Sequence, residues 1–224
     1  MKTKCTKMLA VTVIAFGVIM ITSSKQVHAA ETVKVTELKG VKQINKITVI
    51  GNVDVYLTQG YAENLKVYDD YYSKNALVQW EKGVLRISSY NKEKLAVWIT
   101  VTNLTAIEAS GNTVIRSMNK LSGINLDITL ADGAQANVEA QVVNLNSIVS
   151  DSSHLELSGD AENQVINMDG VAQLETSMFN VQDRSIVMTN NAVASFTQNG
   201  KTTQVKTIAN SLTQNDPLKL SLKE

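Results

Sequence analysis

The chain has few of the residues that cross-link or kink a fold. Its 224 residues include one cysteine, one proline and two histidines, and only 5% are aromatic. A single cysteine, Cys5, excludes an intramolecular disulfide framework and metal sites built on several cysteine ligands. No stretch after residue 30 repeats apolar residues at i, i+3 and i+4, so we expect no amphipathic helix there. The sequence therefore predicts an all-β protein held together by packing.

The first 30 residues have the pattern of an export signal. Three lysines precede an uncharged apolar run from Met8 to Ile21, and Val27-His28-Ala29 resembles a signal-peptidase site. We expect cleavage after Ala29 or Ala30. The alternative is an uncleaved anchor, for which the apolar run is short. Cys5 precedes the run rather than following it, so we expect no lipid anchor and no membrane span in the mature protein.

The charge of the predicted mature chain argues against nucleic acid as a partner. Residues 1–30 hold four of the 21 basic residues and none of the 21 acidic ones, which leaves 17 basic against 21 acidic, or −4. A net negative charge favours solubility and repels phosphate backbones.

Small turn residues recur between residues 104 and 200, at steps of roughly 10 and, for every second turn, roughly 20 residues. They are Ser110-Gly111, Ser122-Gly123, Asp132-Gly133, Asp151-Ser152, Ser158-Gly159, Asp169-Gly170, Asn180, Asn190-Asn191 and Asn199-Gly200. Apolar residues alternate between the turns, and Leu126, Ile128 and Leu130 are expected to face inward. Units this short bury a core only when stacked, as in a solenoid. The alternative is an antiparallel β-sandwich, which has similar strand spacing.

The first half also alternates but carries nearly all the aromatic residues. Ile47 to Gln59 is expected to be a strand, and Leu77 to Ser88 a hairpin with Gly83 in its turn. We therefore predict one domain over residues 31–224: an aromatic-rich half (31–103), the repeat (104–200) and a C-terminal cap or tail (201–224).

Several motifs in this order resemble the head GIN domain family, labelled auto-transporter adhesins. They are the segment from Gly51-Asn52-Val53 to Gly60, the hairpin strand Gly83 to Ile87, the strand Val97 to Val101, and Leu104-x-x-Ile107-x-x-Ser110-Gly111. The resemblance extends over roughly residues 41–200 and implies a right-handed parallel β-helix-like solenoid. It implies no catalytic residues. The family's Gly- and Tyr-rich close is missing between Asn199 and Pro217.

Residues with catalytic or metal-binding chemistry are sparse. His154 is the only histidine after residue 30, and it has no cysteine or acid cluster near it in sequence. Asp132, Asp151 and Asp169 recur at turns, where they would bind a cation in a ladder or bond their own turn backbone. Phosphate-binding loops and nucleophile elbows are absent. We therefore expect no catalysis, no cofactor and no metal.

The exposed aromatic residues are the candidate ligand contacts. Tyr71, Tyr72, Tyr90 and Trp98 all lie in the first half; Trp98 is expected to face outward, as is Tyr56. Such side chains stack on sugars or anchor protein partners. The alternative is that they pack on one another across strands.

Together these features predict an exported, adhesin-like binding module of the periplasm or cell surface. Its partner would be a glycan or an envelope protein. The alternatives are a structural module that self-associates, as a homo-oligomer, through open strand edges, and a polysaccharide-active enzyme of the β-helix type.

Overall fold

The structure is a computed structural model that describes residues 35–38, 40–68, 76–198, 201–206 and 218–223. The chain divides into residues 1–32 and 33–224, and every described residue belongs to the second unit. The predicted export signal and the candidates Tyr71 and Tyr72 lie outside the described residues.

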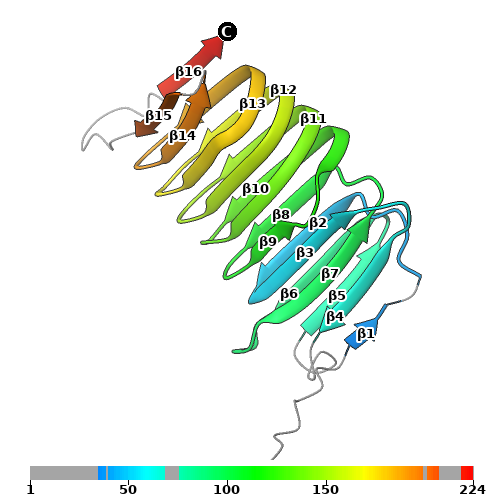
Figure 1. Cartoon of the computed structure of the whole chain (residues 1–224). Helices are drawn as coiled ribbons and strands as arrows, with labels where there is room; N and C mark the ends of the chain where they lie inside the picture. Colours follow the sequence, from blue (N-terminus) through cyan, green and yellow to red (C-terminus); the bar gives the residue numbers. More distant parts are fainter. Residues whose placement is uncertain (1–34, 39, 69–75, 199–200, 207–217, 224) are drawn as a thin grey trace, which may run out of the picture. The chain divides into compact units, whose positions relative to one another are not determined.

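The described residues form strands, turns and loops without a helix, so the all-β prediction is confirmed. The sixteen strands among them belong to one sheet (Figure 1). They are β1 (Val35–Glu37), β2 (Lys46–Gly51), β3 (Val53–Gln59), β4 (Asn64–Tyr68), β5 (Ala76–Glu81), β6 (Val84–Ser89), β7 (Leu95–Val101), β8 (Ala106–Ser110), β9 (Val114–Ser117), β10 (Leu121–Ala131), β11 (Gln135–Val149), β12 (His154–Met168), β13 (Gln173–Met188), β14 (Val193–Gln198), β15 (Lys201–Lys206) and β16 (Leu218–Lys223).

The sheet folds back into two layers that share one core. Layer 1 has the order β5-β6-β2-β8-β10, and layer 2 the order β1-β4-β7-β3-β9, and β11 joins the two. β11 pairs with β9 through residues 135–137 and with β10 through residues 140–149. Buried side chains of both layers form a single hydrophobic cluster, in which Val49 of β2 and Val55 of β3 are fully enclosed.

Beyond β11 the chain stacks in parallel at a nearly constant step. Gln135 lies opposite His154, and His154 opposite Gln173, which is a step of 19 residues. The register shifts between Glu156 and Ser158, and from there the step is 20 residues. In-register pairing places like positions of successive strands beside one another, so their inward apolar side chains line up in rows within the shared core.

Antiparallel strands flank this parallel stack on both sides. β4 pairs with β7, β1 with β4 and β5 with β6, all antiparallel. At the other end β15 pairs with β14 and β16 with β13, also antiparallel. The sheet is therefore mixed.

The predicted alternation is confirmed in the core. Leu126, Ile128 and Leu130 of β10 are at most 1% exposed, while Thr129 between them is half-buried. The predicted hairpin is also confirmed as β5 and β6, with Lys82 and Gly83 at φ 49° and 82° in its turn. Lys82 is the less favoured of the two at positive φ, because it carries a Cβ.

Two predictions about strand ends are wrong. Ile47 to Gln59 is not one strand, because the chain turns at Gly51 and Asn52 from layer 1 into layer 2. Ser122-Gly123, Ser158-Gly159 and Asn180 are not loops but lie within β10, β12 and β13. Small residues suit a bend between layers as well as a turn, so the sequence did not separate the two.

Candidate functional site

Three aromatic rings from three strands form a stack on the outer surface of layer 2. The Trp98 ring on β7 lies 4.6 Å from the Tyr56 ring on β3, centroid to centroid, with an interplanar angle of 19°. Tyr68 on β4 lies 6.4 Å from Trp98 on a tilt of 57°. Trp98 remains 40% exposed, and both tyrosines are half-buried. We call these three residues the aromatic stack.

The alternation of each strand explains why the rings meet. Leu65 and Val67 of β4 are buried, so Tyr68 points outward, as Trp98 does between the buried Val97 and Ile99. The register places Tyr56 directly opposite Trp98. Sequence alternation predicted Trp98 and Tyr56 to face outward, but missed Tyr68, which needed the antiparallel pairing of β4 with β7.

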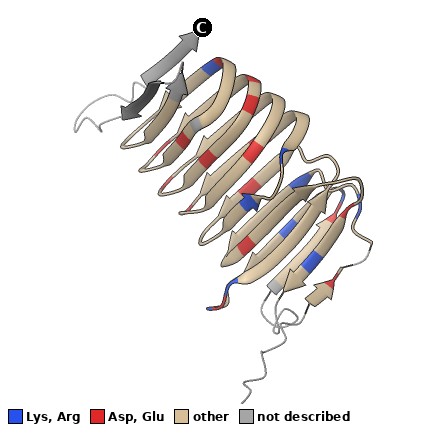
Figure 2. Cartoon of the chain, in the orientation of Figure 1, with Lys and Arg blue, Asp and Glu red and all other residues tan. Residues whose placement is uncertain are grey.

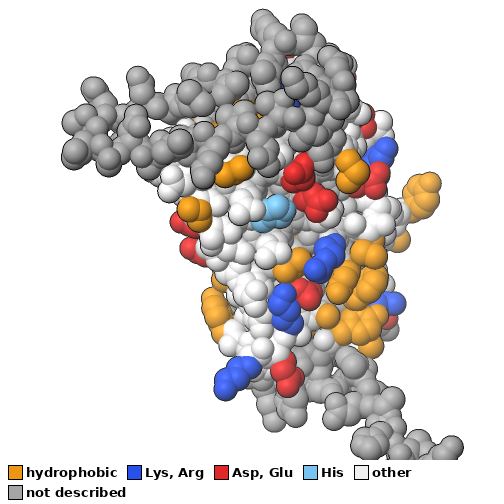
Figure 3. All heavy atoms as spheres, turned by 60° about the vertical axis from the view of Figure 1, so that its left-hand side comes forward, with side chains coloured by type: hydrophobic (Ala, Val, Ile, Leu, Met, Phe, Trp, Pro, Cys, Tyr) orange, Lys and Arg blue, Asp and Glu red, His pale blue; other side chains and the backbone are white. Residues whose placement is uncertain are grey.

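Two basic residues flank the stack in the same row. Lys66 of β4 lies opposite Trp98, and Arg116 of β9 lies opposite Tyr56. Arg116 is exposed and Lys66 half-buried, and in the described part of the chain neither forms an ion pair. The aromatic stack with Lys66 and Arg116 is called the aromatic–basic strip below. Figure 3 shows one view in which large hydrophobic side chains gather beside basic ones in its lower half.

The charge changes sign along the chain. Between residues 118 and 196 there are ten acidic residues and two basic ones, whereas the described positions up to residue 117 hold eight basic and six acidic (Figure 2). Beyond Arg116 the outward row of layer 2 continues to Asn137 and Glu156. The strip therefore lies in the basic half, and its surface becomes acidic toward β12.

The other predicted contacts lie elsewhere. Tyr90 is 79% exposed in the turn before β7, where its Cδ1 would lie 3.6 Å from a Cβ added at Gly51, and it does not join the aromatic stack. In the described residues no ring contact links Tyr90 to Trp98. The structure thus separates these two candidates, and Tyr56 and Tyr68 take the places beside Trp98.

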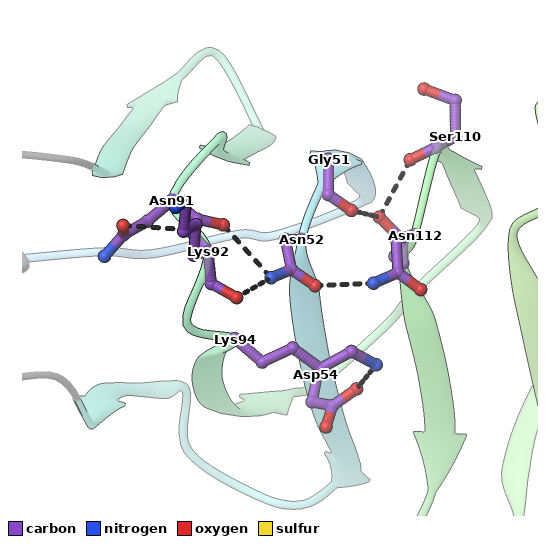
Figure 4. Close-up of polar contacts among 9 residues, drawn as sticks. Gly51, Asn52, Asp54, Asn91, Lys92, Lys94, Ser110 and Asn112 are labelled. Carbon is purple, nitrogen blue, oxygen red and sulfur yellow. Dashed lines mark hydrogen bonds and ion pairs between the residues drawn. The ribbon is translucent and has the colours of Figure 1, made fainter.

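The Gly51-Asn52 turn is held by stacked asparagines (Figure 4). Asn52 donates from Nδ2 to the carbonyl oxygens of Asn91 at 3.1 Å and Lys92 at 3.0 Å. Asn112 donates from Nδ2 to Oδ1 of Asn52 at 2.7 Å. The Asn52 amide thus connects three turns, at residues 51–52, 91–92 and 112. The motif that carries the family resemblance therefore has a structural role at this turn.

The carboxylates of Asp151 and Asp169 accept hydrogen bonds from the neighbouring turns of the stack. Asp132 and Asp151 have φ of 56° and 59°, and Asp151 Oδ2 accepts a hydrogen bond from the Asp132 backbone N–H at 3.3 Å. Asp169 accepts from the Thr189 hydroxyl and from Asn190. The Thr189 hydrogen bond and that of the Gly170 backbone N–H hold the pKa of Asp169 below its ordinary value. Within the described ranges no three His, Cys, Asp or Glu side chains gather as a metal site.

The isolated histidine and the buried arginine do not add to a surface site. His154 is half-buried in β12, between Gln135 and Gln173 in register. Arg184 points into the core, where its guanidinium lies 4.7 Å over the Phe196 ring and its Nε donates to Gln164 Oε1 at 2.7 Å. Burial lowers the pKa of Arg184 to about 10. No helix in the described ranges has the length and apolar character to cross a membrane.

The fold and the site define an all-β module with aromatic side chains exposed on one face. The chain belongs to the family described as "Putative auto-transporter adhesin, head GIN domain", whose model matches residues 43–213. The resemblance seen in the sequence is therefore confirmed. The comparison with curated proteins found no match.

Solved structures share the fold at low sequence identity. A "putative adhesin" from Bacteroides fragilis NCTC 9343 is 21% identical, with a TM-score of 0.63 over 75% of this chain and 80% of that one. A "putative adhesin" from Parabacteroides merdae ATCC 43184 is 15% identical, with 0.61 over 73% and 80%. A "Putative lipid binding protein" from Parabacteroides distasonis ATCC 8503 is 14% identical, with 0.57 over 71% and 79%. Identities this low show a common fold and do not identify a ligand. The ligand class has to be inferred from the candidate site.

Proposed function

We propose that this protein is an exported, non-enzymatic binding module of the cell envelope, acting in the periplasm or at the cell surface. Its ligand is a glycan or an envelope protein, bound on the aromatic-rich half. In this proposal residues 1–30 are a cleaved export signal and residues 31–224 one right-handed parallel β-helix-like solenoid domain.

The solenoid assignment draws support from the parallel pairing of β11, β12 and β13. These strands repeat at steps of 19 or 20 residues with like positions in register. Ladders of like side chains follow the same step. Asn163 donates to Asn144 at 3.0 Å, and Asn144 donates to Asn125 at 2.9 Å.

The aromatic–basic strip is the observation that carries the binding role. A tryptophan stacked on a neighbouring ring is pre-organised, so little side-chain entropy is lost when a ligand is bound. Tryptophan, tyrosine and arginine are also the residues in which binding energy concentrates. The adhesin label of the family agrees with binding rather than turnover.

We expect Trp98→Ala to weaken binding about 5- to 30-fold, the equivalent of about 1–2 kcal/mol for one anchor residue. The experiment screens the mature protein on a glycan array and against envelope extracts, then measures affinity and melting temperature for each variant. Ile148→Ala is the control, because Ile148 is 49% exposed on β11, outside the strip. Unchanged affinity with a lower melting temperature in Trp98→Ala would mean that the stack is only structural.

We also expect the exported protein to begin at Ala30 or Glu31. The signal-like pattern of residues 1–30 predicts cleavage there. N-terminal sequencing of protein recovered outside the cytoplasm checks this. Recovery of a chain that still starts at Met1, in the membrane fraction, would contradict it.

A further inference from the structure

The way the aromatic rings pack determines which parts of them a ligand meets. Trp98 and Tyr56 lie nearly parallel at 4.6 Å, so each ring covers one face of the other, and Tyr68 approaches Trp98 at a tilt. Side chains stand roughly perpendicular to a sheet. The rims of these rings therefore point to solvent, and the Trp98 face between the rings is closed to a sugar.

Ring rims carry the positive part of the aromatic quadrupole, whereas ring faces carry the negative part. The rims also hold the polar atoms of the stack. The Trp98 Nε1–H is a donor only, and the hydroxyls of Tyr56 and Tyr68 each supply a donor. None of these three groups forms a hydrogen bond within the described part of the chain. The stack thus presents donors and positive potential together.

The flanking charges have the same sign. Lys66 and Arg116 lie three strand spacings apart, which is about 14 Å at 4.7–4.9 Å per strand. Neither is neutralised by an ion pair in the described residues. The nearest acids in register are Glu37, beside Lys66, and Glu156, two strands beyond Arg116. Glu37 Oε1 already accepts a hydrogen bond from Asn64 at 2.7 Å.

We propose that the aromatic–basic strip binds an acidic polysaccharide, with carboxylates of the polymer at Lys66 and Arg116 and its oxygens on the ring-rim donors. This inference rests on the proposed binding function and names its ligand class. Two cations this far apart fit one extended polyanion better than one small ligand. Arginine suits the carboxylate because its guanidinium pairs with both oxygens.

The acidic half limits how far the polymer extends. Beyond Arg116 the row reaches Glu156, and ten of the twelve charged residues from 118 to 196 are acidic. A polyanion that follows the row past β9 meets repulsion, so the footprint ends near Arg116. Replacing Glu156 with glutamine is therefore expected to tighten binding about two- to threefold.

The test uses polygalacturonate oligomers and the same oligomers with their carboxylates methyl-esterified, so that only charge differs. We expect the free acid to bind the mature protein at least tenfold more tightly than the ester by calorimetry, and to weaken as salt rises. Lys66→Gln combined with Arg116→Gln should abolish this difference without moving the melting temperature. Lys120→Gln is the control, because it also removes a positive charge but lies outside the strip. The Lys120 Nζ is 4.0 Å from the Glu139 Oε1.

Each other outcome separates the two proposals. Equal affinity for acid and ester, lost in Trp98→Ala, would overturn the acidic class and leave the binding function standing. Absence of binding by the mature protein to any glycan or extract protein would overturn both proposals. Light scattering that shows a dimer dissociated by the Lys66 and Arg116 changes would assign the strip to the acidic half of a second copy, and would overturn the polysaccharide inference.

Discussion

Gly51→Ala is expected to lower the free energy of unfolding by about 3–5 kcal/mol, because it adds both backbone strain and a steric clash. Gly51 has φ of 95°, a conformation that side chains disfavour. A Cβ there would overlap the carbonyl oxygen of Ser89 and lie 3.1 Å from its carbonyl carbon. Both atoms belong to backbone that is fixed by pairing, since Ser89 O accepts the Asn52 N–H at 2.7 Å.

The clash also falls at a crowded joint. Gly111 of the next turn lies so close to Gly51 that a Cβ added to Gly111 would lie 3.2 Å from the Gly51 Cα. Relief of the overlap would therefore move the Asn52 side chain and its bonds to Asn91 and Asn112. At about 2–4 °C per kcal/mol for a domain of this size, we expect the melting temperature to fall by about 6–20 °C.

Gly40→Ala is the matched control for backbone strain. Gly40 has φ of 90°, close to that of Gly51, but nothing lies within 4 Å of an added Cβ. Strain alone predicts a loss of about 1–2 kcal/mol. Urea unfolding of the two variants measures the difference, which is the cost of the clash. Equal losses would show that Ser89 moves away and that the close approach is not essential.

The turn at Gly51 is also a part of the fold that the sequence did not predict. Alternation is a local property, so it correctly assigned the buried face of β10 and the hairpin of β5 and β6. β2 lies between β6 and β8, and β3 lies between β7 and β9. Both positions depend on pairing between distant parts of the chain. No residue pattern within either strand encodes that order. The break at Asn52 was missed for the same reason, because its partners are Asn91 and Asn112.

The candidate site divides in the same way. The exposure of Trp98 follows from its strand, and the sequence predicted it. The flanking Lys66 and Arg116 come from β4 and β9, which are neighbours of the aromatic strands only through the sheet order. Neither residue is close to Trp98 in the sequence, and their common row is a consequence of register. A ligand class inferred from these charges therefore depends on the strand pairing, which the sequence does not show.

Ile128→Ala is expected to cost about 2–5 kcal/mol, the range found when a buried branched side chain is truncated and leaves a cavity. Ile128 is 1% exposed, and in register it lies between the buried Ile107 of β8 and Ser147 of β11. The strands on either side are held by parallel hydrogen bonding, so the neighbours have little room to collapse into the space. We expect the melting temperature to fall by about 4–20 °C at about 2–4 °C per kcal/mol.

Thr129→Ala, one residue further along the same strand, should change stability by no more than about 0.5 kcal/mol. Thr129 is half-buried on the outer face of layer 1, between Glu108 and Ile148 in register. Because the side-chain period of a strand is two residues, a register error of one would exchange the two faces. Chemical unfolding of both variants therefore tests the whole pairing of β8, β10 and β11. A larger loss at Thr129 than at Ile128 would mean that this part of the sheet is assigned to the wrong register.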